Sequence, residues 1–234
     1  MAQNNSRLIS AAKLLEKGLA VADIGTDHAL LPIYLIKNNI AESVIACDIA
    51  EGPLEVAKSN VARCKMEDKI SLRLAKGLDK VKSSECQAVT IMGMGGETIS
   101  KILSDAPWLK NGGQTLILQP MTADDRLREF LVNEGYRIYT EKGVYSKGRV
   151  YTIIKAKYYG KPQTLGEDFY YIGMLLEGDT VGKEEIDYVL KRLKSLKKCL
   201  ESINGVERRK NLYERISVAV PLIEEKLKKL KVTV

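Results

Sequence analysis

Two short apolar segments that each end in an aspartate constrain this chain more than any other feature. One runs from Val21 to Asp23 and enters a turn at Gly25, and the other runs from Ile45 to Asp48. Their spacing is about that of one strand–helix–strand unit. Because the carboxyl ends of parallel strands meet at one edge of a sheet, both carboxylates should face the same ligand site. The pattern therefore predicts a nucleotide-type cofactor site in which Asp48 accepts hydrogen bonds from ribose hydroxyls.

The turn at Gly25 lacks the two further glycines of a dinucleotide-binding loop, because Asp27 and Leu30 occupy those positions. A cradle for a pyrophosphate is therefore not expected. S-adenosylmethionine (AdoMet) has a ribose but no phosphate, so it suits these residues better. Asp23 is expected to hold the amino-acid part of AdoMet, directly or through water. The alternative is that Asp23 only caps a helix or closes a turn.

Strand-like and helix-like segments alternate from Leu19 to Lys157, which predicts an open, mostly parallel sheet covered by helices on both faces. The expected strands are 19–24, 43–49, 69–75, 87–92 and 113–119, and the expected helices are 29–38, 52–65, 95–104 and 122–134. Segments 136–141 and 149–155 have no helix between them, only a short link with Gly143 and Gly148. They should form an antiparallel hairpin. This ending is typical of the class I methyltransferase fold, whereas dinucleotide dehydrogenases close with another crossover.

The segment from Tyr158 to Pro162 is predicted to be a linker, after which strand patterns disappear. We therefore predict a methyltransferase domain in residues 1–157 and a helical domain in residues 158–234. Apolar residues recur there as two interleaved seven-residue series, which is typical of a coiled-coil seam. The members of the series are Ile186, Val189, Leu193, Leu196, Leu200 and Ile203.

Asn204-Gly205 interrupts this seam, and helical spacing of apolar residues resumes at Leu212. An antiparallel helical hairpin, closed within one chain, is the expected result, and we expect a monomer. Pro221 predicts a kink or an interruption in the second helix. The basic cluster Arg208-Arg209-Lys210 falls near the tip of the hairpin. It is either an RNA contact or a solvated helix face.

The charge and cysteine content narrow the class of protein. A formal charge of +7, from 37 basic and 30 acidic residues, attracts polyanions, although a basic surface also serves solubility. No apolar run approaches the roughly 20 residues that span a membrane, and residues 1–17 lack the apolar core of a signal peptide. The four cysteines are widely spaced and there is a single histidine. We therefore expect a cytoplasmic protein without a metal site.

Two further loops follow predicted strands at the same edge of the sheet. Lys76-Gly77-Leu78 stands where the adenine of the cofactor usually lies, yet a lysine replaces the acidic side chain that commonly receives the exocyclic amine. The glycines of Gly93-Met94-Gly95-Gly96 would let a flat base approach the methyl group, unless they only form a tight turn. The predicted cofactor contacts are Asp23, Gly25, Thr26, Asp48, Ile49, Lys76, Gly77, Leu78 and Gly93. The predicted substrate contacts are Met94, Gly95, Gly96, Arg208, Arg209 and Lys210.

Read together, several motifs resemble the bacterial tRNA (adenine-22-N1)-methyltransferase family, TrmK, over about residues 7–157. They are Asp23-Ile-Gly-Thr-Asp-His-Ala, Gly52-Pro-Leu with Ala57 and Asn60, Gly93-Met-Gly-Gly, Leu116-Ile-Leu-Gln-Pro, Leu127-Arg with Phe130-Leu, Glu141 and Tyr151. Asp23-Ile-Gly-Thr-Asp-His combined with Gly93-Met-Gly-Gly is specific, whereas either glycine motif alone is weak. The chain departs from the family at Lys76, where an acidic residue is usual.

The resemblance implies methyl transfer from AdoMet to N1 of adenine 22 of tRNA. Neutral adenine N1 has an in-plane lone pair, so it needs no deprotonation, and the enzyme has mainly to hold donor and acceptor in line. Because the product ring is cationic, a carboxylate beside it would favour the transition state. Asp27 is the predicted catalytic carboxylate and His28 its positioning partner. Alternatively, Asp27 caps the helix that follows and His28 is a capping or packing residue.

Two other functions fit the same residues. One is a methyltransferase acting on another RNA or on a small molecule, which would share the cofactor half of the site. The other is an AdoMet-sensing RNA-binding protein without activity, which the lysine at position 76 leaves open. A nicotinamide-dependent dehydrogenase is disfavoured by the missing phosphate loop.

Overall fold

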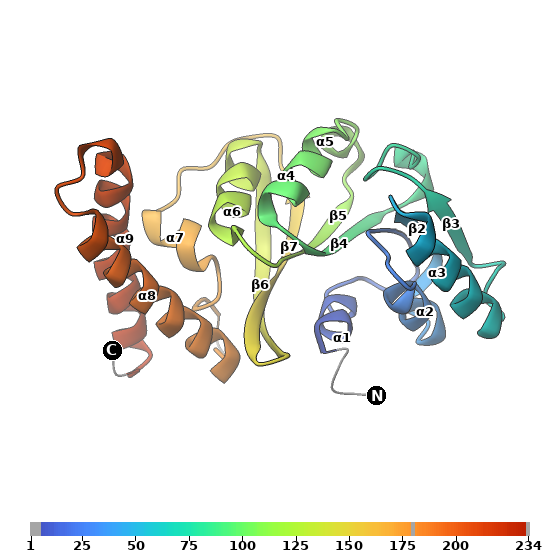
Figure 1. Ribbon diagram of the computed structural model, residues 1–234, viewed down its shortest axis with the longest axis horizontal. Coiled ribbons are helices and arrows are strands. Elements are labelled where there is room, and N and C mark those ends of the chain that lie inside the picture. The colour runs from blue at the N-terminus through green and yellow to red at the C-terminus, as the bar shows by residue number, and fades with distance from the viewer. Residues whose placement is uncertain (1–5, 179–180, 233–234) are drawn as a thin grey trace.

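One seven-stranded sheet organises most of the molecule in the computed structural model, which describes residues 6–178 and 181–232 (Figure 1). The strands are β1 (Leu19–Ile24), β2 (Ala41–Asp48), β3 (Ile70–Leu74), β4 (Ala88–Met94), β5 (Thr115–Pro120), β6 (Tyr136–Ser146) and β7 (Arg149–Tyr158). Their order is β3-β2-β1-β4-β5-β7-β6. The first five are parallel, and β7 runs antiparallel to both β5 and β6. The predicted parallel sheet and its terminal hairpin are confirmed.

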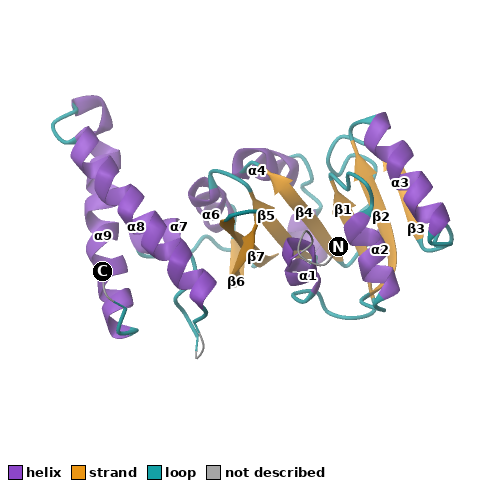
Figure 2. Cartoon of the chain, turned by 60° about the horizontal axis from the view of Figure 1, so that its bottom comes forward, coloured by secondary structure: helices purple, strands orange, loops and turns teal. Residues whose placement is uncertain are grey.

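Helices cover both faces of this sheet, as Figure 2 shows. The α-helices are α1 (Ser6–Ala12), α2 (Leu30–Lys37), α3 (Glu51–Arg63), α4 (Gly96–Ser104), α5 (Leu109–Gly112), α6 (Asp124–Asn133), α7 (Glu167–Ile172), α8 (Lys183–Ile203) and α9 (Lys210–Lys229). Two short 3-10 turns are η2 (Ser83–Glu85) and η3 (Glu207–Arg209). Side chains from α1, α2 and α3 form the core on one face, and those from α4, α5 and α6 form the core on the other. Every residue of β5 is buried, as expected for a strand covered on both faces.

The β6–β7 hairpin is longer and tighter than the sequence suggested. Gly143 lies inside β6, and the turn consists of Lys147 and Gly148 alone. Both turn residues have positive φ, 49° and 77°, which is the type I′ geometry that matches the twist of antiparallel strands. The expected link around Gly143 is therefore wrong. The turn lies beside α1, toward the bottom of Figure 1.

The C-terminal helices pack around their own core. Apolar side chains of α7, α8 and α9 form it, including Ile172, Val189 and Ile223. The predicted helical hairpin is present, but α7 makes it a three-helix unit, which the sequence reading missed. The expected interruption at Pro221 is wrong, because α9 continues through it. Pro221 and Ser217 are both exposed, so the carbonyl that loses its helical donor can be hydrated.

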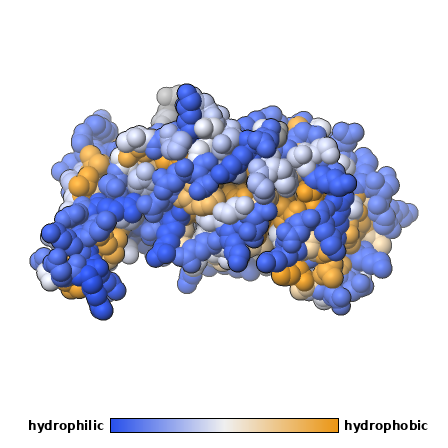
Figure 3. Space-filling model, turned by 90° about the horizontal axis from the view of Figure 1, so that it is seen from above, coloured by the Kyte–Doolittle hydropathy of each residue, from blue (hydrophilic) through white to orange (hydrophobic). Residues whose placement is uncertain are grey.

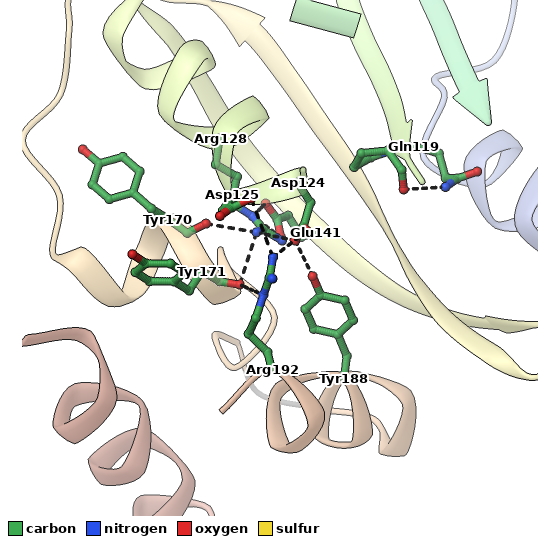
Figure 4. A network of polar contacts seen from close by, with 10 residues as sticks. Gln119, Asp124, Asp125, Arg128, Glu141, Tyr170, Tyr171, Tyr188 and Arg192 are labelled. Atoms are coloured by element: carbon green, nitrogen blue, oxygen red, sulfur yellow. Dashed lines mark hydrogen bonds and ion pairs between the residues drawn. The ribbon is translucent and has the colours of Figure 1, made fainter. Parts of the chain in front are cut away.

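A buried polar network joins this helical unit to the sheet (Figure 4). The Arg128 guanidinium, on α6, is fully buried and donates to Glu141 at 2.9 Å and to Asp124 at 2.8 Å. Arg192 and Tyr188 of α8 donate to the same Asp124 carboxylate. Burial opposes the charged form of Asp124, but the two arginines outweigh it and hold the pKa of Asp124 below its usual value. The helical unit is thus tied to the sheet by paired charges.

The segment predicted to be a linker is also held in place. β7 extends to Tyr158, and the main-chain N–H groups of Tyr159 and Gly160 both donate to the carbonyl of Gly135. The chain therefore leaves the sheet in a fixed direction before it reaches α7.

Candidate active site

The loop after β1 is fixed to the end of β2 by successive hydrogen bonds. The N–H groups of Gly25 and Thr26 both donate to the Cys47 carbonyl at 2.9 Å, and the N–H of Asp27 donates to the Asp48 carboxylate at 3.0 Å. Gly25 has a φ of 72°, and a Cβ there would lie 2.2 Å from the terminal methyl of Met94. The positive φ of the turn therefore favours glycine, whereas the Met94 methyl is the mobile end of a flexible side chain that can move aside.

A cavity of about 490 Å³ opens at this edge of the sheet. It brings together the loops after β1, β4 and β5, helix α1 and the turn of the β6–β7 hairpin. Its lining residues are Arg7, Leu8, Asp23, Gly25, Thr26, Asp27, Leu30, Leu31, Met92, Gly93, Met94, Gln119, Met121 and Lys147. Asp23, Gly25, Thr26, Asp27, Gly93 and Met94 are thereby placed in one wall, as predicted from sequence.

Asp23 is the buried carboxylate of this cavity, with only 4% of the residue exposed. Burial raises the pKa of Asp23 to about 6, and the negative charge of Asp48 adds to the rise. A 2.6 Å hydrogen bond from the Thr90 hydroxyl lowers the pKa but does not offset the burial. The alternative in which Asp23 caps a helix is wrong, because its carboxylate accepts a hydrogen bond from Thr90 on the neighbouring strand β4. Thr26 Oγ1 is buried beside it without a partner among the described residues. A ligand ammonium and carboxylate would satisfy both groups.

Asp48 lines neither this cavity nor a second one described below, but its partner Asp27 lines the first and its neighbour Ile49 lines the second. Its two oxygens accept main-chain N–H bonds from Asp27 and Ala50, which fixes the carboxylate and leaves lone pairs for hydroxyl donors. Ile49, the next residue, is 69% exposed. This arrangement fits the ribose contact predicted for Asp48.

The second cavity has a volume of about 230 Å³ and is mainly apolar. Its lining residues are Ile24, Ile49, Ala75, Lys76, Gly77, Leu78, Met94, Thr98, Lys101, Ile102 and Asp105. An apolar lining suits an adenine ring, and Met94 borders both cavities. Asp105, at the end of α4, is the carboxylate in this lining, a feature that the sequence reading missed. It can accept the exocyclic amine in place of the acidic side chain absent at Lys76.

Asp27 and His28 occupy different positions relative to the first cavity. The Asp27 side chain, 69% exposed, lines it, and His28 Nε2 lies 3.4 Å from Asp27 Oδ1. His28 itself is outside the lining. The N-cap of α2 is Ala29, without a side-chain hydrogen bond, so the capping alternative is wrong for both residues. The side chain of His28 is 46% exposed, which also argues against a packing role.

The glycine loop after β4 divides into two parts. Gly93 and Met94 line the first cavity, but Gly95 and Gly96 do not. A Cβ at Gly96 would lie 2.2 Å from the Ala123 carbonyl oxygen, so this glycine allows α4 to approach the loop before α6. Gly96 therefore has a packing role, and the substrate contacts predicted for Gly95 and Gly96 stay a prediction.

Three polar residues of the cavity were not predicted. Arg7 of α1 donates to Gln119 Oε1 at 2.7 Å and lies over the Tyr151 ring, 5.1 Å from its centroid. Lys147 comes from the hairpin turn. No motif marks Arg7 or Lys147 in the sequence, since α1 and the turn reach the site only through the fold. Gln119 lay within a motif that carried the resemblance, but no role was assigned to it.

The predicted tRNA contacts lie elsewhere. Arg208, Arg209 and Lys210 are all exposed in η3 and at the start of α9. This connection between α8 and α9 lies toward the top of Figure 1, away from the hairpin turn that lines the cavity. Within residues 6–178 and 181–232, no helix is long and apolar enough to cross a membrane, and no acidic, cysteine or histidine cluster could hold a metal ion.

Comparison with known proteins identifies the family. Residues 4–154 match the family described as "Methyltransferase domain". The whole chain is 33% identical to the tRNA (adenine(22)-N(1))-methyltransferase of Bacillus subtilis, over 96% of this chain and 90% of that protein. The chain belongs to the tRNA (adenine(22)-N(1))-methyltransferase family. The predicted resemblance and the class I methyltransferase fold are confirmed.

Two solved structures similar to this chain contain the cofactor or its product. TrmK of M. capricolum, solved with S-adenosyl-homocysteine, is 32% identical, with a TM-score of 0.75 over 95% of this chain and 96% of that one. A Streptococcus pneumoniae protein solved with S-adenosyl-L-methionine is 28% identical, with a TM-score of 0.80 over 96% of this chain and 99% of that one. Both cover the C-terminal helices as well as the sheet, so the whole architecture is that of the tRNA (adenine(22)-N(1))-methyltransferase family.

Proposed function

We propose that this protein transfers a methyl group from AdoMet to N1 of adenine 22 of tRNA. The observation that carries the proposal is the pair of adjoining cavities at the carboxyl ends of β1, β2 and β4, with Asp23, Asp48 and the apolar second cavity in the order in which AdoMet presents its parts. Family membership supplies the acceptor, because the curated B. subtilis relative is named for adenine 22.

The residues present fit AdoMet along its length. Asp23 and Thr26 would hold the amino-acid end, Asp48 the ribose hydroxyls, and the cavity between Ile49 and Ile102 the adenine. When bound, AdoMet supplies an electrophilic methyl group. Gly93 has no atom within 4 Å of a Cβ position, so the backbone there leaves space beside the bound cofactor.

The chain's own residues then have to orient the acceptor base. Adenine N1 attacks through its existing lone pair, so no general base is needed, and positioning accounts for most of the rate. The Asp27 carboxylate, on the cavity wall, would stabilise the positive charge that develops on the ring. His28, 3.4 Å from that carboxylate, would orient it. A base within folded tRNA must first be exposed, which fits an open cavity mouth.

We further propose a division of labour between residues 1–157, which hold the cofactor and the base, and the helical unit 158–234, which contacts tRNA through Arg208, Arg209 and Lys210. Since α7, α8 and α9 close their own apolar core, we propose a monomer. We also propose that the protein acts in the cytoplasm, where it would meet its tRNA substrate.

The test is to incubate the protein with methyl-labelled AdoMet and unmodified tRNA and to map the labelled nucleotide. We expect 1-methyladenine at position 22. Label in a protein or a small molecule would contradict the tRNA acceptor, and AdoMet binding without transfer to any RNA would favour a sensor. Single-turnover rates of Asp27→Ala and His28→Ala then test the catalytic roles. Rates near that of the wild type would remove both from the mechanism.

A further inference from the structure

The β6–β7 hairpin carries an unusual excess of positive charge. Between Tyr136 and Tyr158 the chain has six basic residues and one acidic residue. That acidic residue, Glu141, is buried and bonded to Arg128, so it does not face solvent. Lys155 and Lys157 approach Glu16 at 3.6 and 3.8 Å, but no ion pair to Arg137 is present within the described residues. Arg137, Lys142, Lys147 and Arg149 are exposed, so the hairpin presents a basic ribbon of four side chains to solvent.

At the end of this ribbon farthest from the hairpin turn, an arginine lies between two exposed tyrosines. The Arg137 guanidinium carbon is 5.6 Å from the ring centroid of Tyr139 and 5.5 Å from that of Tyr159. Tyr139 is 47% exposed and Tyr159 is 54% exposed. We call these three residues the Arg137 clamp.

The backbone fixes the clamp from both sides. Tyr139 is the extra residue of a β-bulge, because Ile138 pairs with Ala156 while Thr140 pairs with Lys155. Bulges redirect side chains and are common at sheet edges, and β6 is the edge strand. The N–H of Tyr159 donates to the Gly135 carbonyl at 2.8 Å. Tyr139 is therefore presented by the edge strand β6, and Tyr159 by the first residue after β7, whose main chain is hydrogen-bonded to Gly135.

We propose that the Arg137 clamp is a second tRNA contact, which stacks an unpaired nucleotide of the substrate outside the catalytic cavity. This inference rests on the proposed tRNA substrate. Aromatic rings and arginine planes are the groups on which proteins stack splayed RNA bases, and the adjacent lysines suit the RNA backbone. The molecular face seen in Figure 3 is mainly hydrophilic, with its hydrophobic side chains in separate patches.

The clamp is too far from the cavity for one small-molecule acceptor to occupy both at once. Two residues of β7 mark the distance between cavity and clamp. Arg149 is next to the turn whose Lys147 lines the cavity, and Lys157 pairs with Arg137 near the other end of the strand. That distance is roughly 27 Å at about 3.4 Å per residue. A folded RNA can span this distance while its target base enters the cavity, whereas a free nucleoside cannot.

The test compares tRNA affinity at one fixed salt concentration for Tyr139→Ala, Tyr159→Ala and the two corresponding Tyr→Phe variants. Tyr145→Ala is the matched control, because Tyr145 is a 60% exposed tyrosine on the same strand outside the clamp. Loss of one stacked base weakens binding by about 5- to 150-fold. We expect that loss for each alanine variant, affinity near wild type for the phenylalanine variants and for Tyr145→Ala, and unchanged AdoMet affinity throughout.

Three outcomes would overturn the clamp. The first is alanine variants that bind tRNA within about twofold of wild type, with or without a lower melting temperature, since the rings would then only protect the edge strand. The second is phenylalanine variants as weak as the alanine variants, because stacking needs only the ring. The third is tRNA cross-linking to Tyr145 but to neither clamp tyrosine. If the wild-type protein methylates tRNA and the variants bind normally, only the clamp falls. If the wild type neither binds nor methylates tRNA, the proposed function falls.

Discussion

Two buried polar clusters in this protein differ in how completely their hydrogen bonds are satisfied. At the junction with the helical unit, Arg128 donates to two carboxylates and to the carbonyls of Tyr170 and Tyr171. In the cavity wall, Thr26 Oγ1 has no partner within the described chain, and Asp23 has one close hydroxyl donor. Buried polar groups that hydrogen-bond to one another stabilise the architecture, whereas buried groups without a protein partner are available to bind a ligand. The two clusters should therefore respond oppositely to substitution.

The largest expected effect is on stability, from Arg128→Met. The variant leaves Glu141 buried without its countercharge, which should lower the free energy of unfolding by about 3–5 kcal/mol. Denaturant titration measures it. The control is Arg126→Met on the same helix, where a 71% exposed arginine pairs with Glu97 at the surface. This substitution should lower the free energy of unfolding by about 1 kcal/mol or less. Equal, small losses in both variants would refute the structural role of the network.

Asp23→Asn should act on the ligand instead. Losing a charge-assisted hydrogen bond should weaken AdoMet binding by about 10- to 150-fold, as measured by calorimetry. The pKa of Asp23 in the folded protein, about 6, lies above the ordinary aspartate value of 3.8, so the buried charge costs stability at neutral pH. Its removal should therefore not destabilise the fold. A variant that unfolds easily yet binds AdoMet normally would place Asp23 with the structural cluster.

The same raised pKa predicts a pH dependence of AdoMet affinity. The carboxylate that pairs with the ligand ammonium is present above pH 6 and is lost as the pH falls through that value. Lowering the pH from about 7 to about 5 should weaken binding up to about tenfold. Asp23→Asn should flatten this profile. An unchanged slope in the variant would assign the titration to another group.

The smallest expected effect is that of Arg7→Gln. Arg7 contacts Gln119 at the cavity and lies on Tyr151, so it should help to hold the entering nucleotide. We expect the KM for tRNA to rise about three- to tenfold, from the loss of about one charge-assisted contact, with AdoMet affinity unchanged. Lys13→Gln, an exposed position just after α1, is the control. A fall in kcat at unchanged KM would indicate a role in the chemical step instead.

The same comparison decides how the helical unit can be tested. Cutting the chain after β7 would remove Arg192 and Tyr188 and uncover the buried Arg128, so a truncation confounds tRNA binding with unfolding. Neutralising Arg208, Arg209 and Lys210 in the intact chain avoids this problem, because all three are exposed. The salt dependence of tRNA affinity should then become shallower.

Local patterns predicted the elements near the cofactor well. The apolar runs ending at Asp23 and Asp48 specify parallel strands, and their spacing places both carboxylates at one edge, as the structure has them. The roles of Arg7 and Lys147 could not be predicted, because each reaches the cavity from a distant part of the chain. The same holds for Asp105, which lies at the end of a helix rather than of a strand. The packing role of Gly96 could not be predicted, because a packing glycine and a substrate-facing glycine look alike in sequence.

The central claim is that the open polar cluster serves methyl transfer to one adenine. Its most direct test is the initial rate of label transfer from AdoMet to two tRNA transcripts that differ only in having adenine or guanine at position 22. We predict transfer to the adenine transcript by the wild-type protein, none to the guanine transcript, and strongly reduced transfer by Asp23→Asn at the same AdoMet concentration. Equal labelling of both transcripts would contradict the account.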